Sequence, residues 1–115
     1  MKIGSLEIVA LLVFALTVAG IIASSIHFGG RITTPRIPMQ WGLDGNPTWY
    51  ATRTIGLWWP LFFVLAMGLG MISLGLFSDA GKAAGFWVVV MLFPIIFALI
   101  QLWHFNMVAR WASKQ

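Results

Sequence analysis

The sequence predicts an all-α membrane protein with three transmembrane helices and an ordered loop between the first two. Of its 115 residues, 60% are hydrophobic and only 9% are charged, and the mean hydropathy is +0.92. Soluble domains have about a quarter of their residues charged. Lipid or partner proteins must therefore cover the apolar surface of this chain. We treat residues 1–115 as a single membrane domain.

The first apolar run extends from about Leu6 to Phe28. As a helix it is about 34 Å long at ~1.5 Å per residue, which is enough to cross a ~30 Å hydrocarbon core. The run is too long for the apolar region of a signal peptide, and the stretch at residues 23–25 is a poor cleavage site. We therefore expect a retained helix over residues 6–28.

The second and third runs predict helices over residues 60–77 and 85–105. Pro60 suits the first position of a helix because no hydrogen bond is lost there. An alternative is a start at Thr54 with a kink at Pro60. Pro94 lies inside the third run, where a bend is expected. The link between the two helices is so short that they should be antiparallel neighbours.

Tryptophan and tyrosine gather near the ends of these runs. An indole has an apolar body and one N–H donor, and it therefore prefers the head-group layer of a bilayer. Such an aromatic belt is a better interpretation than a stacking platform for nucleotides or sugars. The residues concerned are Trp41, Trp49, Tyr50, Trp58, Trp59, Trp87, Trp103 and Trp111.

Small residues four positions apart occur in or near each predicted helix. This spacing places them on one helix face, where another helix can approach closely. Equally, glycine is simply frequent in membrane helices. The sequence leaves both interpretations open for the pairs Gly20/Ser24, Ala19/Ala23, Ala66/Gly70 and Gly81/Gly85.

The 26-residue segment from Gly29 to Thr54 is the sizeable part of the chain outside the helices. Two prolines hold its first half extended. Asp44-Gly45 and Asn46-Pro47 are strong turn signals. Apolar residues alternate with polar or small ones and should share one face that lies on the membrane or on the helix ends: Met39, Trp41 and Leu43. We therefore expect an ordered interfacial loop over residues 29–54.

Within this loop a set of residues forms the candidate binding signature: Ile37, Pro38, Gln40, Trp41, Asp44, Gly45, Asn46, Pro47, Tyr50 and Arg53. The pattern resembles the loop of the bacterial SdpI-like membrane proteins, and more narrowly their N-terminal domain of unknown function. That domain has Ile-Pro-x-His and an aromatic residue, then a glycine and a second aromatic residue. Gln40 stands where relatives have the histidine. The link after the second helix is short and has one lysine, where relatives often have a longer basic loop.

The resemblance implies a multi-pass protein of the bacterial cytoplasmic (inner) membrane that acts in toxin immunity or envelope stress. The best-known relatives protect a bacterium against a secreted toxin and relay its presence to a repressor. The expected partners are the lipid bilayer and another membrane protein or a second copy, and no nucleic acid. The small size equally fits an accessory subunit that packs against a larger membrane complex.

Catalysis and cofactors are not expected from this sequence. Cysteine is absent, and the acidic residues are Glu7, Asp44 and Asp79. A third function, transport or metal handling, would use His27 and His104. Metal sites generally need three or four ligands, so interfacial hydrogen bonding is the default interpretation of both histidines. The expected protein is therefore a non-enzymatic one.

Charge and resemblance disagree about orientation. If the helices alternate in direction, the loop and the C-terminus share one side of the membrane. That side has Arg31, Arg36, Arg53, Arg110 and Lys114, and the other has Lys2 and Lys82. The positive-inside rule then places the loop in the cytoplasm. The resemblance implies an outward loop with the N-terminus in the cytoplasm, which is the orientation we expect.

Overall fold

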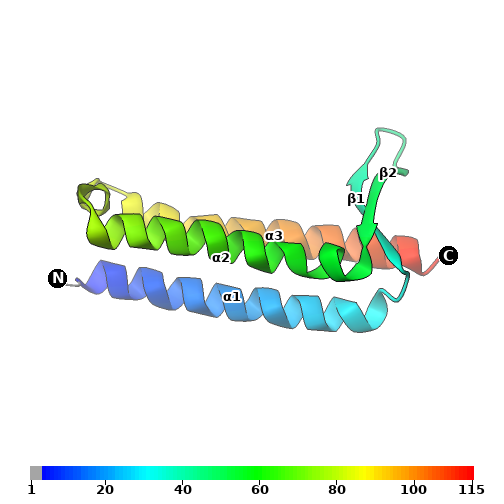
Figure 1. The fold of residues 1–115 in the computed structure, drawn as a ribbon, viewed down its shortest axis with the longest axis horizontal. Coiled ribbons are helices and arrows are strands. Elements are labelled where there is room, and N and C mark those ends of the chain that lie inside the picture. The colour runs from blue at the N-terminus through cyan, green and yellow to red at the C-terminus, as the bar shows by residue number, and fades with distance from the viewer. Residues whose placement is uncertain (1–3) are drawn as a thin grey trace.

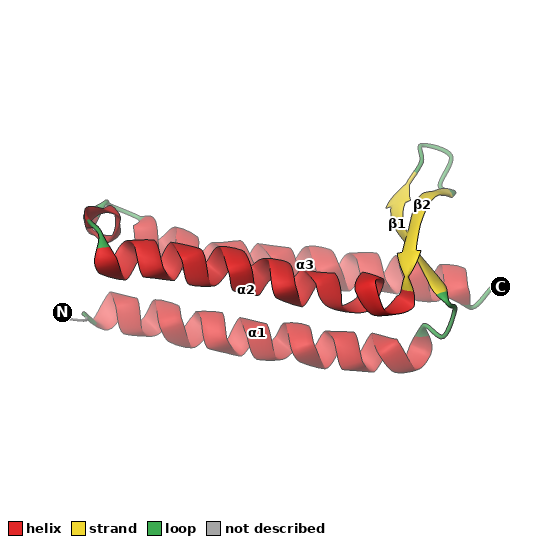
Figure 2. Cartoon of the chain, in the orientation of Figure 1, coloured by secondary structure: helices red, strands yellow, loops and turns green. Residues whose placement is uncertain are grey.

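The computed structural model describes residues 4–115, which form three long helices and one β-hairpin (Figures 1 and 2). The helices are α1 (Ser5–Arg31), α2 (Arg53–Phe77) and α3 (Phe86–Ala112), and each is long and apolar enough to cross a membrane. In Figure 1, α1 begins at the end of the bundle where α2 connects to α3, and the hairpin and the C-terminus lie at the opposite end. This arrangement agrees with the predicted alternation of three helices.

Three helix boundaries differ from the prediction. The first helix ends at Arg31 rather than at Phe28, so residues 29–31 belong to α1 and not to the loop. The start of α2 at Pro60 is wrong, because the helix begins at Arg53 and passes through Pro60, close to the alternative start at Thr54. The proline ring removes only one intrahelical donor, and the residues before it can still form a helical turn. α3 continues past residue 105 to Ala112, since the polar residues there include no helix breaker.

The prediction of a loop between the first two helices is wrong. This segment forms an antiparallel hairpin of β1 (Arg36–Trp41) and β2 (Pro47–Thr52). The alternation and turn signals that suggested an ordered loop are also those of a hairpin. The register is irregular on both sides of Gln40. Leu43 lies in the turn beyond β1 and is fully exposed, so it does not share an apolar face with Met39 and Trp41.

Two clusters of buried residues hold the structure together. The first packs α1, α2 and α3 along the bundle and contains Ala10, Phe14, Ile21, Val64, Ile72, Trp87 and Val90. The second packs the hairpin and the connection before it onto all three helices, with Phe28, Ile32, Ile37, Leu57, Phe105, Val108 and Ala109. The second cluster therefore fixes the hairpin to the bundle.

Small residues contribute to this packing, but largely at positions other than the predicted pairs. Ala19, Gly20 and Ala23 are exposed on α1, and Ala66 and Gly70 are exposed on α2. Of the predicted residues, Gly81 makes a close contact, with the backbone of Gly75 on α2. The other close contacts are made at glycines of α2 itself. A side chain at Gly68 would overlap the ring of Phe14, and one at Gly56 would lie 3.1 Å from Ile37 Cβ.

The link between α2 and α3 forms a 3₁₀ helix, η1 (Asp79–Lys82), at the end of the bundle away from the hairpin. Lys82 forms an ion pair with Asp79 at 3.0 Å, and the indole N–H of Trp87 donates to the Gly81 carbonyl at 3.2 Å. Lys2, the other basic residue assigned to this side, lies outside the described residues.

Candidate functional site

The predicted signature residues all lie at the hairpin end of the bundle, but they divide into two groups. Ile37 and Pro38 are buried and Arg53 is half-buried, so these three anchor the hairpin. The remaining residues lie on the hairpin itself, where Trp41 and Pro47 are half-buried and the others are exposed: Gln40, Asp44, Gly45, Asn46 and Tyr50. The signature therefore describes a folded arm and its attachment, not one closed pocket.

Arg53 joins the end of α1 to the start of α2. Its Nε donates to the Ile32 carbonyl at 2.7 Å, and its Nη2 donates to the Gly29 carbonyl. The last carbonyls of a helix have no intrahelical donor, and a cation is favourable beside them. The backbone N–H of Arg53 also donates to Pro35 at 3.0 Å. One residue thus fixes α1, α2 and the base of the hairpin.

Asp44 organises the tip of the hairpin. Its Oδ1 accepts a bond from the backbone N–H of Asn46 at 3.0 Å, and its Oδ2 accepts one from the side-chain amide at 3.2 Å. These two bonds, the backbone one foremost, hold the pKa of Asp44 below its usual value. Gly45 has a φ of +81°, which favours glycine. The tip is therefore an ordered turn that presents a negative charge.

A buried chain of hydrogen bonds connects the three helices below the hairpin. Ser25 on α1 donates its hydroxyl proton to the Leu57 carbonyl on α2 at 2.9 Å, and Gln101 on α3 donates Nε2 to Ser25 Oγ at 3.3 Å. Ser25 is 1% exposed and Gln101 4%. The contact lies next to Pro60, whose missing N–H leaves the carbonyl of Gly56, one position before Leu57, without its intrahelical donor.

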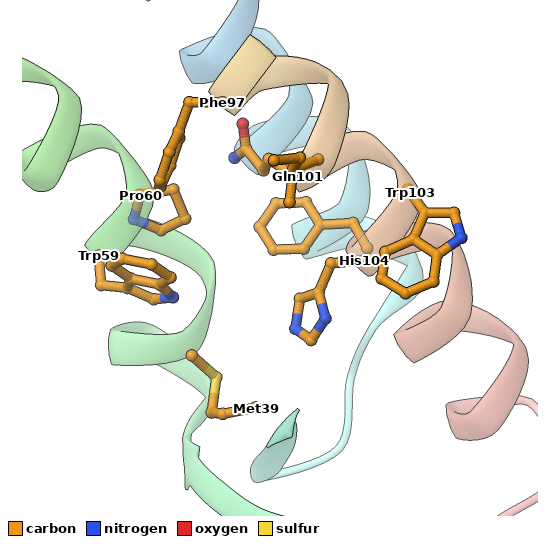
Figure 3. Close-up of a pocket in the computed structure, with 9 residues that line it drawn as sticks. Met39, Trp59, Pro60, Phe97, Gln101, Trp103 and His104 are labelled. Carbon is orange, nitrogen blue, oxygen red and sulfur yellow. The ribbon is translucent and has the colours of Figure 1, made fainter. Parts of the chain in front are cut away.

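A cavity of about 190 Å³ lies between α2 and α3 next to this chain (Figure 3). Its wall is largely aromatic and apolar and comprises Met39, Trp59, Pro60, Phe97, Ile100, Gln101, Trp103, His104 and Phe105. Two of the lining residues also have a buried polar atom without a hydrogen-bond partner within residues 4–115, Gln101 Oε1 and His104 Nε2, and neither atom is accessible from the cavity. The apolar wall makes the cavity a candidate ligand site.

The two histidines do not share this cavity. His104 lines it from α3, whereas His27 is exposed on α1 and contacts the ring of Phe28 edge-on at 5.0 Å. In the described part of the chain, no group of three or more His, Cys, Asp or Glu side chains is placed to hold a metal ion. The two histidines therefore do not form a common site.

A second recess of about 440 Å³ lies between the hairpin and the last turns of α3. Arg110 and Lys114 give it positive charge, and Trp41 and Trp111 give it aromatic surface. Tyr50 stands beside Trp111, with their ring centroids 5.9 Å apart. Cations and indoles at the end of a membrane helix suit contact with anionic lipid head groups.

Sequence reasoning missed the two polar residues that matter most inside the bundle. Gln101 interrupts a long apolar run, which is a signal for an intramembrane polar site. Ser25 had no distinguishing signal, because a serine near the end of a membrane helix is ordinary. Its contact with Leu57 depends on how the helices are rotated.

The fold and this site together define a small helical protein of membrane type with a hairpin at one end. Comparison with models of known protein families, with curated proteins and with solved structures gave no match. The resemblance to the SdpI-like loop therefore depends on the signature residues alone.

Proposed function

We propose that this protein is a non-catalytic, multi-pass protein of a bacterial cytoplasmic membrane that recognises another protein through its hairpin. A role in toxin immunity or envelope stress follows from its resemblance to the SdpI-like loop. The observation that carries the proposal is the apolar surface of the hairpin. Leu43 is fully exposed, Trp49 is 55% exposed and Tyr50 is 41% exposed. Exposed apolar side chains outside the spanning helices are typical of contact sites.

The direction of the hairpin supports this role. It runs across the helix axes at the end of the bundle (Figure 1), so it lies along the membrane surface if the helices cross the bilayer. The bonds of Asp44 at its tip and of Arg53 at its base hold it in a defined shape. A preorganised arm loses less entropy when it binds a partner.

A photo-crosslinking residue at position 43 tests the proposal in native membranes. We expect one discrete protein adduct there, and lipid adducts from the same residue at Leu16, which is 73% exposed in the middle of α1. Trp41→Ala or Gly45→Val should abolish the protein adduct at unchanged membrane levels. His27→Ala and His104→Ala should have milder effects. Lipid adducts alone at position 43 would contradict a recognition role.

For the orientation we propose an outward hairpin with the N-terminus in the cytoplasm. Arg53 should count less toward the positive-inside rule than a free basic residue, because its guanidinium is bound to backbone carbonyls at the end of α1. The chain has no cysteine, so single substitutions Thr48→Cys, Ala83→Cys and Ser113→Cys give clean labelling by a membrane-impermeant reagent. We expect labelling from outside at positions 48 and 113 only. Labelling at position 83 alone would reverse the orientation, and opposite results for 48 and 113 would exclude three spans.

An accessory subunit of a larger membrane complex is the second candidate. It is favoured by the small residues that face outward, Ala19, Gly20 and Ala23 on α1 and Ala66 and Gly70 on α2. Such residues let another helix approach closely. Gly20→Trp and Gly70→Trp should then release the protein from a complex in a native gel, whereas Leu43→Ser should not. The opposite pattern would favour recognition by the hairpin.

A further inference from the structure

We propose that the recess between the hairpin and the last turns of α3 binds one anionic phospholipid. The phosphate lies at Arg110 and Lys114, and an acyl chain runs along α3 to the apolar cavity between α2 and α3. The inference depends on the helices crossing a bilayer, and it does not depend on recognition of a protein by the hairpin. It is based on the charge of the recess and on its place on the same face of α3 as the cavity.

The recess has a positive charge that is not compensated in the described part of the chain. Arg110 and Lys114 are four positions apart on α3, so they share one helix face, and both side chains are exposed. The residues that line the recess include no acidic side chain. Within residues 4–115, the single ion pair joins Asp79 and Lys82 at the other end of the bundle. A phosphate group supplies the negative charge that suits these two cations.

The other polar groups of the recess define the head group. The amide nitrogen of Asn46 donates to Asp44, and that of Gln115 donates to the carbonyl of Trp111, both at 3.2 Å. The oxygens of these two amides can accept bonds from hydroxyl groups. Phosphatidylglycerol has both an anionic phosphate and free hydroxyl groups. The ammonium of phosphatidylethanolamine would instead lie near two cations, with no carboxylate among the lining residues.

The recess continues into the apolar cavity along one face of α3. Residues at intervals of three and four positions form this face: Ile100, Trp103, Met107, Arg110 and Lys114. The first two line the cavity and the last three line the recess. β1 borders both, with Met39 at the cavity and Trp41 at the recess. The face thus changes from apolar to cationic toward the end of α3, as a phospholipid changes from chain to phosphate.

The spacing of the two sites matches the dimensions of a phospholipid. Arg110 lies ten residues after Ile100, which is about 15 Å along the helix axis at ~1.5 Å per residue. Half of a ~30 Å hydrocarbon core is also about 15 Å. A phosphate bound at Arg110 therefore places its acyl chain beside Trp103 and Ile100, which are 60% and 56% exposed. The apolar wall of the cavity (Figure 3) can receive part of this chain.

Native mass spectrometry of the full-length protein in a non-ionic detergent tests the inference. Phosphatidylglycerol and phosphatidylethanolamine with the same acyl chains are added in turn, and the lipid-bound fractions give their affinities. We expect phosphatidylglycerol to bind about tenfold or more tightly, because each basic residue beside an anionic lipid contributes a factor of about five. Arg110→Gln and Lys114→Gln should each reduce this preference about fivefold, whereas Arg110→Lys should keep most of it.

Arg31→Gln is the matched control for these variants. It removes an exposed charge at the same end of the bundle but outside the recess, so the preference for phosphatidylglycerol should be unchanged. Equal losses in Arg31→Gln and Arg110→Gln would overturn the inference and assign the preference to the overall charge of this end. Equal affinities of the two lipids, or no bound phosphatidylglycerol, would overturn it as well.

Two further measurements test the acyl chain. Trp103→Ala should weaken the binding of both lipids by a similar factor, because the ring lies beside the chain and away from the head group. Unchanged affinities in Trp103→Ala would exclude the cavity from the lipid site. Glycerol 3-phosphate, which has no acyl chain, should not displace phosphatidylglycerol even in large molar excess. Displacement would assign the recess to a soluble phosphate compound and contradict a lipid site.

Discussion

The side-chain amide of Gln101 on α3 donates a hydrogen bond to the hydroxyl of Ser25 on α1, and both residues are almost completely buried. Ser25 passes its own proton to the carbonyl of Leu57 on α2. Leu57 follows Gly56, whose carbonyl has no intrahelical donor because Pro60, four positions further on, has no N–H. Two bonds thus connect the three helices close to Pro60.

Loss of the Ser25 hydroxyl should destabilise the bundle. Ser25→Ala removes the donor to Leu57 and the acceptor for Gln101, and we expect a cost of about 1 kcal/mol, in the range of interhelical bonds in membranes. Unfolding of the purified protein by SDS titration measures this cost. Ser24→Ala is the control, because the Ser24 hydroxyl is buried without a partner in the described chain. A similar loss in both variants would argue against the three-helix chain.

The guanidinium of Arg53 should be needed for a tight end of α1. Arg53→Lys keeps the charge but cannot reach both carbonyls with a fixed fork, and we expect a loss of ~2 kcal/mol. Hydrogen exchange of the segment 29–35 should accelerate accordingly. Arg36→Lys alters an exposed arginine on β1 and should leave this exchange unchanged. Unaltered exchange in Arg53→Lys would show that packing alone holds the helix end.

Two neighbouring glycines of α2 should respond in opposite ways to a methyl group. Gly68→Ala places Cβ inside the ring of the buried Phe14, and we expect overpacking to cost ~1–3 kcal/mol. Gly70→Ala meets no heavy atom within 4 Å in the described structure, and it should be neutral or stabilising by up to ~1 kcal/mol. SDS or thermal unfolding of both variants checks the sign. Equal effects would mean that Phe14 does not pack on Gly68.

The three helices were predictable because long apolar runs have few alternative structures. The ends of the helices were less predictable, since Pro60 suggested the start of α2 but lies inside this helix. The hairpin was missed because Pro38 and Pro47 argue against ordinary strands. A two-stranded hairpin consists of edge strands only, and proline is tolerated in an edge strand. The bulges around Gln40 also disturb the alternation that marks a strand.

The internal site could not be predicted for a different physical reason. In a helix that faces lipid on one side and protein on the other, both faces are apolar, and the pattern of hydrophobic residues does not mark the buried one. Gln101 could be recognised as unusual, but it is 76 positions away from Ser25 in the chain, and their contact depends on how α1 and α3 are rotated about their axes. The same holds for the place of His104 in the wall of the cavity between α2 and α3.

Acidification should loosen the tip of the hairpin. The bonds from Asn46 lower the pKa of Asp44 in the folded state below its usual value of 3.8. A lowered folded-state pKa means that the ionised carboxylate stabilises the turn above about pH 4. This contribution is lost as the pH falls through the folded pKa. NMR exchange or line widths of the Gly45 and Asn46 amides between pH 7 and pH 2.5 measure the change.

The variant Asp44→Asn tests whether the pH dependence of the tip comes from the carboxylate of Asp44, because it removes the charge and keeps the shape of the side chain. Its amide oxygen can still accept the bond from the Asn46 N–H, but it has no proton to gain in this pH range. We therefore expect an ordered tip whose amide signals are independent of pH, while the wild-type signals broaden below about pH 4. Broadening of the same amides with the same midpoint in Asp44→Asn would assign the transition to another group. A wild-type tip that stays rigid to pH 2.5 would show that backbone geometry alone, with Gly45 at positive φ, is sufficient to hold the turn.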